Sequence, residues 1–436
     1  RMGPVLVDVP MDVQQAQLYC DIADIRPSPA FPEDDARDAA DRLTAVLAGA
    51  QRPVVLWGGG VGMAGVGAQL SQWLDQTAIP FVASWAGLSA FSHDHDGYVG
   101  QIGVYGNRGA NFVLQNADAV IVLGSRLDNR QRSGNSENFA VGAAVHVLDI
   151  DGEEIRKYGG GRYSGTVIDL RALPQILSRT RTPPVSPDWR DYVRQMKAAY
   201  RGRESSSTAR RLNTLSPYDV MRRLSEIVDE DAVVAGDTGA AVCWLHQGFS
   251  VRRQTLFTAG GNSPMGYALC AAIGAKLSAP DRQVVSVNGD GGFQVNIQEL
   301  QTIAHLGLDI QIVVMNNVSY GIIKQFQDSY LGGRHTASQE GYSTPDFGAV
   351  ARAYGLAHHR IERMDQLQAG LFVGGPSVIE IVLSEETLIE PKLEMGRPIN
   401  DQFPYLPQDA YVKGNRFVDY PRPAAIRQIV TDDDGQ

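Results

Sequence analysis

Two short polar segments, each directly after an apolar run, together offer oxygen ligands for a hard cation. Gly289-Asp290-Gly291-Gly292 follows the run 284–287, and Asn316-Asn317 follows the run 310–315. The residues between them, 297–306, have the pattern of a helix, so the unit is predicted to be βαβ with a right-handed crossover. Asp290 and Asn317 are then expected at the same carboxyl edge of a parallel sheet, where open α/β sheets bind ligands.

The donor types at this edge suit Mg²⁺ bound to a diphosphate. Mg²⁺ prefers octahedral oxygen ligands and usually takes few protein groups together with phosphates and water. Asp290 offers a carboxylate, Asn317 an amide oxygen, and the backbone carbonyl near Ser319 a third oxygen. Gly289, Gly291 and Gly292 let backbone N–H groups approach phosphate oxygens closely. The expected metal ligands are therefore Asp290, Asn317 and Ser319.

This pair of segments resembles the thiamine-diphosphate motif, a Gly-Asp-Gly followed by Asn-Asn, with residues 292–315 between them. The alternative is a Gly-Asp-Gly turn and an unrelated Asn pair that caps a helix. Further stretches resemble the acetolactate synthase (acetohydroxyacid synthase-like) family: Gln298-Glu299-Leu300, Pro345-Asp346-Phe347 and Ala353-Tyr354-Gly355. The likeness extends over nearly the whole chain, up to about Pro391.

The resemblance implies thiamine diphosphate and Mg²⁺ as cofactors and a set of cofactor-binding residues. Met265 stands where the family has the bulky residue that props the cofactor in its bent form. Ile322, Ile323 and Phe326 stand at the substrate end, where the family often has Gly-Met-Val and a tryptophan. The full set of implied cofactor-binding residues is Asp237, Thr238, Gly239, Ser263, Met265, Gly289, Asp290, Gly291, Gly292, Asn317, Ser319, Tyr320, Gly321 and Ile322.

The first half of the chain resembles the family's central domain, which in acetolactate synthases holds FAD. Gly58-Gly59-Gly60 follows an apolar strand, as a dinucleotide-binding loop would, although three glycines alone are a weak signal. The segment 126–130 resembles the family's Arg-Phe-Asp-Asp-Arg. Relatives without FAD keep this fold, so the resemblance does not decide whether this chain binds FAD. The candidate residues are Gly58, Gly59, Gly60, Ser84, Trp85, Arg126, Asp128, Arg130, Asp149 and Ile150.

The predicted fold class is α/β, with two doubly wound parallel-sheet domains. Near-continuous apolar runs, such as 53–57, 119–123 and 310–315, are typical of strands buried on both faces. The expected division is residues 1–14 as the end of an otherwise absent pyrimidine-binding domain, 15–37 as a linker, 38–180 as the central domain, 181–215 as a second linker, 216–390 as the thiamine-diphosphate-binding domain and 391–436 as a tail.

Composition narrows the class of protein. The chain has 436 residues and a net charge of −10, which argues against non-specific nucleic-acid binding because that requires a basic face. There is no long apolar run or signal peptide, so no membrane association is expected. The cysteines, Cys20, Cys243 and Cys270, match neither a zinc site nor a disulfide framework and suit a reducing cytoplasm.

The resemblance implies a carboligase or decarboxylase that decarboxylates a 2-oxo acid such as pyruvate and transfers the acyl carbanion to a carbonyl acceptor. The tail, with Arg397-Pro398-Ile399-Asn400, is closer to acetolactate-synthase-like proteins of sugar or secondary metabolism. The family's activating glutamate comes from a pyrimidine-binding domain, so no catalytic residue is assigned here. A partner chain or lost residues would supply that domain, in a homo- or hetero-oligomer. The alternatives are a non-catalytic cofactor-binding scaffold and a simple 2-oxo-acid decarboxylase or lyase.

Three other features are expected to be structural. His93 and His95 flank Asp94 in a loop for which solvation is favoured over metal binding. His358-His359 is expected at the end of a helix. The polar stretch 203–211 is expected to be exposed and mobile.

Overall fold

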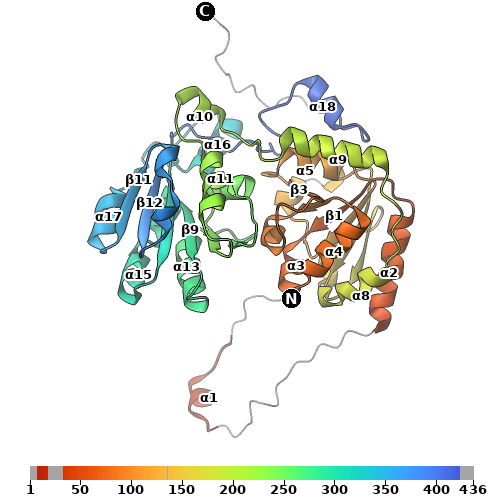
Figure 1. The fold of residues 1–436 in the computed structure, drawn as a ribbon, viewed down its shortest axis with the longest axis horizontal. Coiled ribbons are helices and arrows are strands. Elements are labelled where there is room, and N and C mark those ends of the chain that lie inside the picture. The colour runs from red at the N-terminus through yellow and green to blue at the C-terminus, as the bar shows by residue number, and fades with distance from the viewer. Residues whose placement is uncertain (1–6, 18–32, 135, 423–436) are drawn as a thin grey trace, which may run out of the picture.

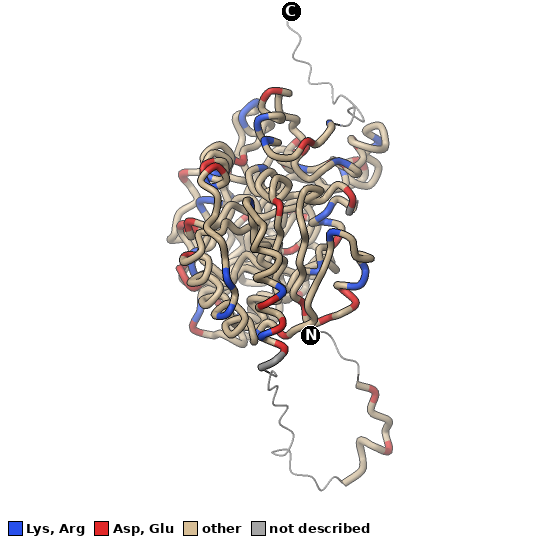
Figure 2. Tube along the Cα trace, turned by 90° about the vertical axis from the view of Figure 1, so that its right-hand side faces the viewer, with Lys and Arg blue, Asp and Glu red and all other residues tan. Residues whose placement is uncertain are grey.

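The computed structural model describes residues 7–17, 33–134 and 136–422. Its two six-stranded sheets are parallel throughout, and Figure 1 shows them side by side, each flanked by helices. This confirms the predicted α/β class with two doubly wound domains. Acidic and basic residues are interspersed along the trace in the view of Figure 2.

The first sheet has the order β3-β2-β1-β4-β5-β6. Every residue of β1 and β4 is buried, as the apolar runs predicted. From β1 the chain first adds β2 and β3 on one side, and then adds β4, β5 and β6 on the other side. The ligand crevice of such sheets forms at this switch point, between β1 and β4. The elements are α2 (Glu33–Ala48), β1 (Pro53–Trp57), α3 (Gly59–Ala64), α4 (Gly67–Thr77), β2 (Phe81–Ala83), β3 (Tyr98–Gln101), α5 (Arg108–Gln115), β4 (Ala119–Leu123), α6 (Asn129–Arg132), β5 (Ala144–Asp149), α7 (Gly152–Arg156), β6 (Tyr163–Val167) and α8 (Leu173–Arg179).

The second sheet has the order β11-β12-β10-β9-β7-β8, with the fully buried strand β10 near its centre. Its elements are α11 (Pro217–Ile227), β7 (Val233–Gly236), α12 (Gly239–Gly248), β8 (Thr255–Phe257), α13 (Tyr267–Ser278), β9 (Val284–Gly289), α14 (Asp290–Val295), α15 (Leu300–Leu306), β10 (Ile310–Asn316), α16 (Gly321–Tyr330), α17 (Phe347–Ala353), β11 (Ala357–Ile361) and β12 (Ser377–Val382).

The segments outside the two sheets bind them together. Helix α9 (Pro187–Tyr200) lies along α5 in Figure 1, and its Trp189 donates to the carbonyl of Pro53. Helix α18 (Gln408–Gly414) belongs to the tail, and the hydroxyl of Tyr192 donates to the carbonyl of Gly414 at 2.6 Å. The tail thus packs over the first domain instead of forming a core of its own.

Three local expectations are wrong. The stretch 203–211 is not exposed throughout, because it leads into α10 (Ser207–Leu212) and buries Glu204 and Ser206. His358 and His359 lie within strand β11 rather than at a helix end. His93 is buried rather than solvated.

The N-terminal expectations lie largely outside the described residues. Residues 1–6 and 18–32, with Cys20, are not described. Residues 7–10 form no strand, and the short helix α1 (Met11–Gln15) is exposed throughout. In the described ranges, no helix has both the length and the apolar character needed to cross a membrane.

Candidate functional site

Asp290 and Asn317 meet at the carboxyl edge of the second sheet. Strands β9 and β10 pair in parallel, with Gly289 opposite Met315, so the residues after each strand emerge together. The second carboxylate oxygen of Asp290, Oδ2, accepts from the backbone N–H of Ser319 at 3.4 Å. The structure therefore brings together the three residues predicted as metal ligands.

The carboxylate of Asp290 is buried and held mainly through one oxygen. Its Oδ1 accepts from the N–H of Gly291 at 2.6 Å and from the hydroxyl of Tyr342 at 2.8 Å. Burial raises the pKa of Asp290 above its ordinary value, and the hydrogen bond from Tyr342 is the largest effect that opposes the rise. Tyr342 was missed by the sequence analysis, because no motif marks it and it follows Asp290 by 52 residues.

Two neighbouring polar groups have unmet hydrogen-bonding capacity. The side-chain amide nitrogen of Asn317 and the hydroxyl of Ser319 are buried, and neither finds a partner in the described part of the chain. Buried polar atoms are normally hydrogen-bonded. An oxygen-rich ligand at this edge would satisfy them, so the residues present fit a Mg²⁺–diphosphate group. The carbonyl of Ser319 accepts from Gly321 at 2.8 Å and keeps a second lone pair.

Two helices begin beside this edge. Helix α12 begins at Gly239 and α16 at Gly321. A Cβ on Gly239 would lie 3.7 Å from Ile322, and one on Gly321 would lie 3.7 Å from Ala240, so the two N-termini abut. Helix N-termini carry partial positive charge and unpaired donors, which suits phosphate.

Asp237 lies behind the Gly-Asp-Gly turn. It is almost fully buried, and its Oδ1 accepts from the N–H of Ala268 in the first turn of α13 at 3.3 Å. Burial is the main cause of its raised pKa. A Cβ on Gly292 would stand 1.9 Å from Oδ2 of Asp237. Asp237 therefore supports the turn from behind, and only a residue without a side chain fits above it.

The remaining candidates surround the turn. Thr238 and Ser263 share a hydrogen bond between their hydroxyls at 2.6 Å. The ring of Tyr320 covers Gly291, because a Cβ there would lie 2.2 Å from Cε1 of that ring. Met265 is 39% exposed. Ile323 and Phe326 are also exposed on the outer face of α16, whereas Ile322 packs partly into the core.

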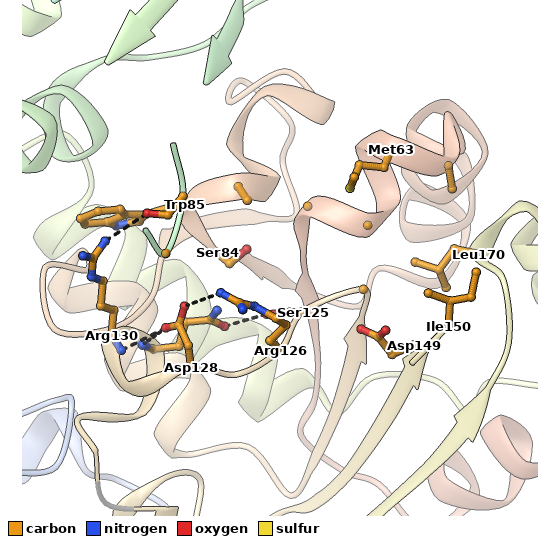
Figure 3. A pocket seen from close by; sticks show the side chains of 18 of the residues that line it. Met63, Ser84, Trp85, Ser125, Arg126, Asp128, Arg130, Asp149, Ile150 and Leu170 are labelled. Carbon is orange, nitrogen blue, oxygen red and sulfur yellow. Dashed lines mark hydrogen bonds and ion pairs between the residues drawn. The ribbon is translucent and has the colours of Figure 1, made fainter. Parts of the chain in front are cut away.

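The first domain contains a separate cavity of about 590 Å³ at the carboxyl ends of its central strands. Figure 3 shows its lining, with Arg126, Asp128 and Arg130 on one side and Asp149, Ile150 and Leu170 on the other. The volume lies within the usual range of cofactor pockets. All the residues predicted for FAD line it except Gly58.

Glycines bring two loops of this cavity into contact. The N–H of Gly60 donates to the carbonyl of Gly124 at 3.0 Å, and a Cβ on Gly60 would lie 2.8 Å from the Cα of Gly124. Gly58 lies behind this contact, where a Cβ would meet the Gly124 carbonyl oxygen at 2.2 Å. Gly58 therefore serves the close approach of the loops rather than the cavity wall.

The segment 126–130 closes the cavity against the second domain. Asp128 caps α6 by accepting from the N–H groups of Arg130 and Gln131, and it forms an ion pair with Arg126 at 3.9 Å. Arg130 lies over the ring of Trp85 and donates to the carbonyl of Gly260 at 3.3 Å.

The sequence analysis missed part of this lining. Gly124, Ser125 and Leu170 follow strand ends and could have been found by that signal, whereas Gly260 and Gly261 come from the other domain and carry no local signal. The lining residues missed were Met63, Ala64, Ala86, Ile102, Gly124, Ser125, Gln131, Asp169, Leu170, Arg171, Gly260 and Gly261.

No group of three or more His, Cys, Asp or Glu side chains that could hold a metal occurs among the residues described. The Asp290 site has a single carboxylate, an amide and backbone oxygens. That composition fits Mg²⁺ held jointly with phosphates rather than a zinc or calcium cage.

Comparison with known proteins agrees with this architecture. The family model "Thiamine pyrophosphate enzyme, central domain" matches residues 40–171, and "Thiamine pyrophosphate enzyme, C-terminal TPP binding domain" matches residues 237–381. These ranges nearly coincide with the two sheets. The fold and site are thus those of a thiamine-diphosphate enzyme.

The similar proteins narrow the family. The chain is 31% identical over 405 residues to acetolactate synthase isozyme 2 large subunit of Escherichia coli (strain K12), covering 91% of this chain and 71% of that protein. It is 31% identical over 421 residues to the acetolactate synthase large subunit of Corynebacterium glutamicum, covering 92% and 66%. It is 30% identical over 406 residues to acetolactate synthase isozyme 1 large subunit of E. coli, covering 91% and 70%. The chain belongs to the acetolactate synthase family of thiamine-diphosphate-dependent enzymes.

Proposed function

We propose that this protein is a Mg²⁺- and thiamine-diphosphate-dependent carboligase that acts on a 2-oxo acid such as pyruvate. The observation that carries the proposal is the carboxyl edge of the second sheet, where the buried carboxylate of Asp290 lies beside the unpaired polar groups of Asn317 and Ser319. When bound, the cofactor would supply a carbon nucleophile that attacks the 2-oxo acid and stabilises the carbanion left by decarboxylation.

The residues of this chain would bind and orient the cofactor. Asp290, Asn317 and the Ser319 carbonyl would hold Mg²⁺, and the N-termini of α12 and α16 would receive the diphosphate. Asp237 supports the turn from behind through its contact with α13. Met265, exposed in the loop before α13, is available to prop the thiamine portion.

The substrate end is proposed to lie along the outer face of α16. Ile323 and Phe326 are exposed there, at 51% and 41%, so they are accessible to a substrate or to a neighbouring domain. They replace the family's Val and Trp, which supports an acceptor other than that of branched-chain amino-acid synthesis. A role in sugar or secondary metabolism is the corresponding proposal.

The 590 Å³ cavity of the first domain is proposed to bind FAD in a structural role. Nine of the ten candidate residues line it, and it combines the Gly60–Gly124 contact with the cations Arg126 and Arg130. The test is an absorbance spectrum of the purified protein, followed by a spectrum of any flavin that heat denaturation releases from it. A colourless protein that binds no added FAD would contradict it.

The activating glutamate is proposed to come from a pyrimidine-binding domain. The described residues form two sheets, and the two matched models describe a central and a TPP-binding domain. The third domain would come from a partner chain or from further residues of the same protein, in an oligomer.

The test is the change Asp290→Asn in the protein with any partner that co-purifies. We expect the affinity for thiamine diphosphate at fixed Mg²⁺, measured by calorimetry, to fall by more than roughly a hundred-fold, because even outer-shell partners of metal ligands typically account for 10–100-fold. Pyruvate consumption should fall with it.

Asp309→Asn is the matched control. Asp309 lies at the opposite end of β10, where its carboxylate accepts from Gln311, and this variant should bind normally. Wild-type protein that binds cofactor but converts no 2-oxo acid would identify a scaffold. Production of an aldehyde without ligation would identify a decarboxylase.

A further inference from the structure

Tyr342 lies over the Gly-Asp-Gly turn although it belongs to the loop between α16 and α17. Its ring centre lies 4.5 Å from that of Tyr320. Its hydroxyl is close to the turn, because a Cβ on Gly291 would stand 3.1 Å from that oxygen. No sequence motif places Tyr342 here.

The hydrogen bonds around Tyr342 have a defined direction. The side-chain amide N–H of Gln294 donates to the Tyr342 hydroxyl at 3.3 Å. That hydroxyl donates to Oδ1 of Asp290 at 2.8 Å. Gln294 also donates to the backbone carbonyl of Asp290 at 3.1 Å, so its own position is set by the turn. The proton of the hydroxyl therefore points to the carboxylate.

The two carboxylate oxygens of Asp290 therefore differ in how many hydrogen bonds they accept. Oδ1 receives the hydrogen bonds of Gly291 and Tyr342, which occupy both of its lone pairs. Oδ2 accepts a long hydrogen bond from the N–H of Ser319 at 3.4 Å, and the backbone N–H of Val318 also acts on this carboxylate. The oxygen with capacity to spare is thus the one on the side of Asn317 and Ser319.

We propose that Tyr342 is a positioning residue that, together with Gln294, fixes the rotation of the Asp290 carboxylate so that Oδ2 is presented to the cation. The inference rests on the proposed function, because the cation is the Mg²⁺ of that site. Tyr342 acts through Asp290, and outer partners of this kind orient metal ligands and tune their affinity.

The test uses Tyr342→Phe in the full-length protein with its native partners. Mg²⁺ and Mn²⁺ are titrated at saturating thiamine diphosphate, with Mn²⁺ binding followed by electron paramagnetic resonance. We expect the apparent cation Kd to rise roughly 10-fold, within the 10–100-fold typical of outer-shell partners. Gln294→Met should raise it less, and the double variant should match Tyr342→Phe, because both residues act along one chain.

Tyr354→Phe is the matched control, since it removes a hydroxyl for which no hydrogen bond is found among the described residues, at the end of α17. Thermal melts identify any variant that fails to fold. An unchanged cation Kd in Tyr342→Phe would overturn the inference while the proposed function stands. A lower Kd would also overturn it, because Tyr342 would then compete with the cation. Wild-type protein that binds no cation would instead refute the proposed function.

Discussion

The Gly-Asp-Gly turn packs closely against the carboxylate of Asp237. Gly292 has no room for a side chain, because Oδ2 of Asp237 already lies where its Cβ would be. Asp237 is almost fully buried and tied to the first turn of α13, while Gly292 is held in α14. The role of this glycine is therefore a steric one that the cofactor motif alone does not reveal.

Gly292→Ala is expected to destabilise the protein by about 1–3 kcal/mol, the usual cost of forcing extra volume into a packed site. The new methyl group would lie 1.9 Å from the carboxylate oxygen unless Asp237 shifts. Urea unfolding measures the change. Adding Asp237→Ser should recover part of the loss, and strictly additive effects of the two changes would count against the clash.

Gly274→Ala on α13 is the control for that experiment. A Cβ there meets nothing within 4 Å. The substitution should raise the free energy of unfolding slightly, by about 0.4–1 kcal/mol, because alanine favours a helix.

Strands β11 and β12 hold the Asn-Asn turn from the neighbouring side of the sheet. Glu380 on β12 accepts from the side chain of Asn316 at 2.8 Å and from Arg360 on β11 at 2.9 Å, and it lies 3.1 Å from His358. The other end of the Asn316 side chain accepts from the N–H of Val318 at 3.2 Å. An edge strand without a sequence signature thus supports the residues at the site.

Glu380→Gln is expected to lower the free energy of unfolding by about 1–3 kcal/mol, because it removes a buried charge that bonds to Asn316, His358 and Arg360. Cofactor binding should weaken at the same time, as the Asn316 turn loses its anchor. Chemical unfolding and calorimetric titration measure the two effects. Glu362→Gln is the control, since Glu362 pairs with the same Arg360 at 3.0 Å but is exposed, and a surface pair contributes little. Equal losses in the two variants would contradict this account.

Buried hydrogen bonds contribute to the junction between the two domains. The N–H of His93 donates to the carbonyl of Val251 at 2.7 Å, and the N–H of Val251 donates to Nδ1 of His93 at 3.1 Å. Nε2 of His93 then donates to the carbonyl of Leu88 at 2.9 Å. This pattern requires the neutral ring, because a proton on Nδ1 would face the Val251 donor.

Stability is expected to fall as the pH falls from about 6.5 toward 4. Burial is the main cause of the fall in the pKa of His93 to about 4; the hydrogen bond to Leu88 opposes this fall and the charge of Arg201 contributes to it. Below its unfolded pKa of about 6.5 the unfolded chain binds the proton and the folded chain does not, so acid favours unfolding. His93 should thereby cost about 2 kcal/mol of stability between pH 7 and pH 5.

Urea unfolding at pH 7 and pH 5 tests this dependence. His93→Gln should be less stable at pH 7 and should lose less on acidification than the wild type. The buried His246 and His146, whose pKa values are lowered to about 3 and about 4, contribute in the same direction in both proteins. His359→Gln on the edge strand β11 is the control, and an acid response of His93→Gln equal to that of the wild type would contradict the assignment to His93.

The sequence by itself determined the class of fold and the meeting of Asp290 with Asn317. Apolar runs predicted β1 and β4 at their observed bounds, and the handedness of a βαβ unit places the ends of its two strands at one edge. Both rules depend on short stretches of sequence, so they can be applied without knowledge of the tertiary structure. The same holds for nine of the 21 residues that line the first-domain cavity, whereas the other twelve were not predicted.

The tertiary structure alone decided which distant groups complete these sites. Tyr342 reaches Asp290 through the path of a loop, and Gly260 closes the first-domain cavity from the other domain. Glu204 and Ser207, whose surrounding composition suits an exposed segment, bond instead to Asn107 and to Glu390. Such contacts depend on how whole elements pack, and packing brings together residues whose separation in the chain follows no period.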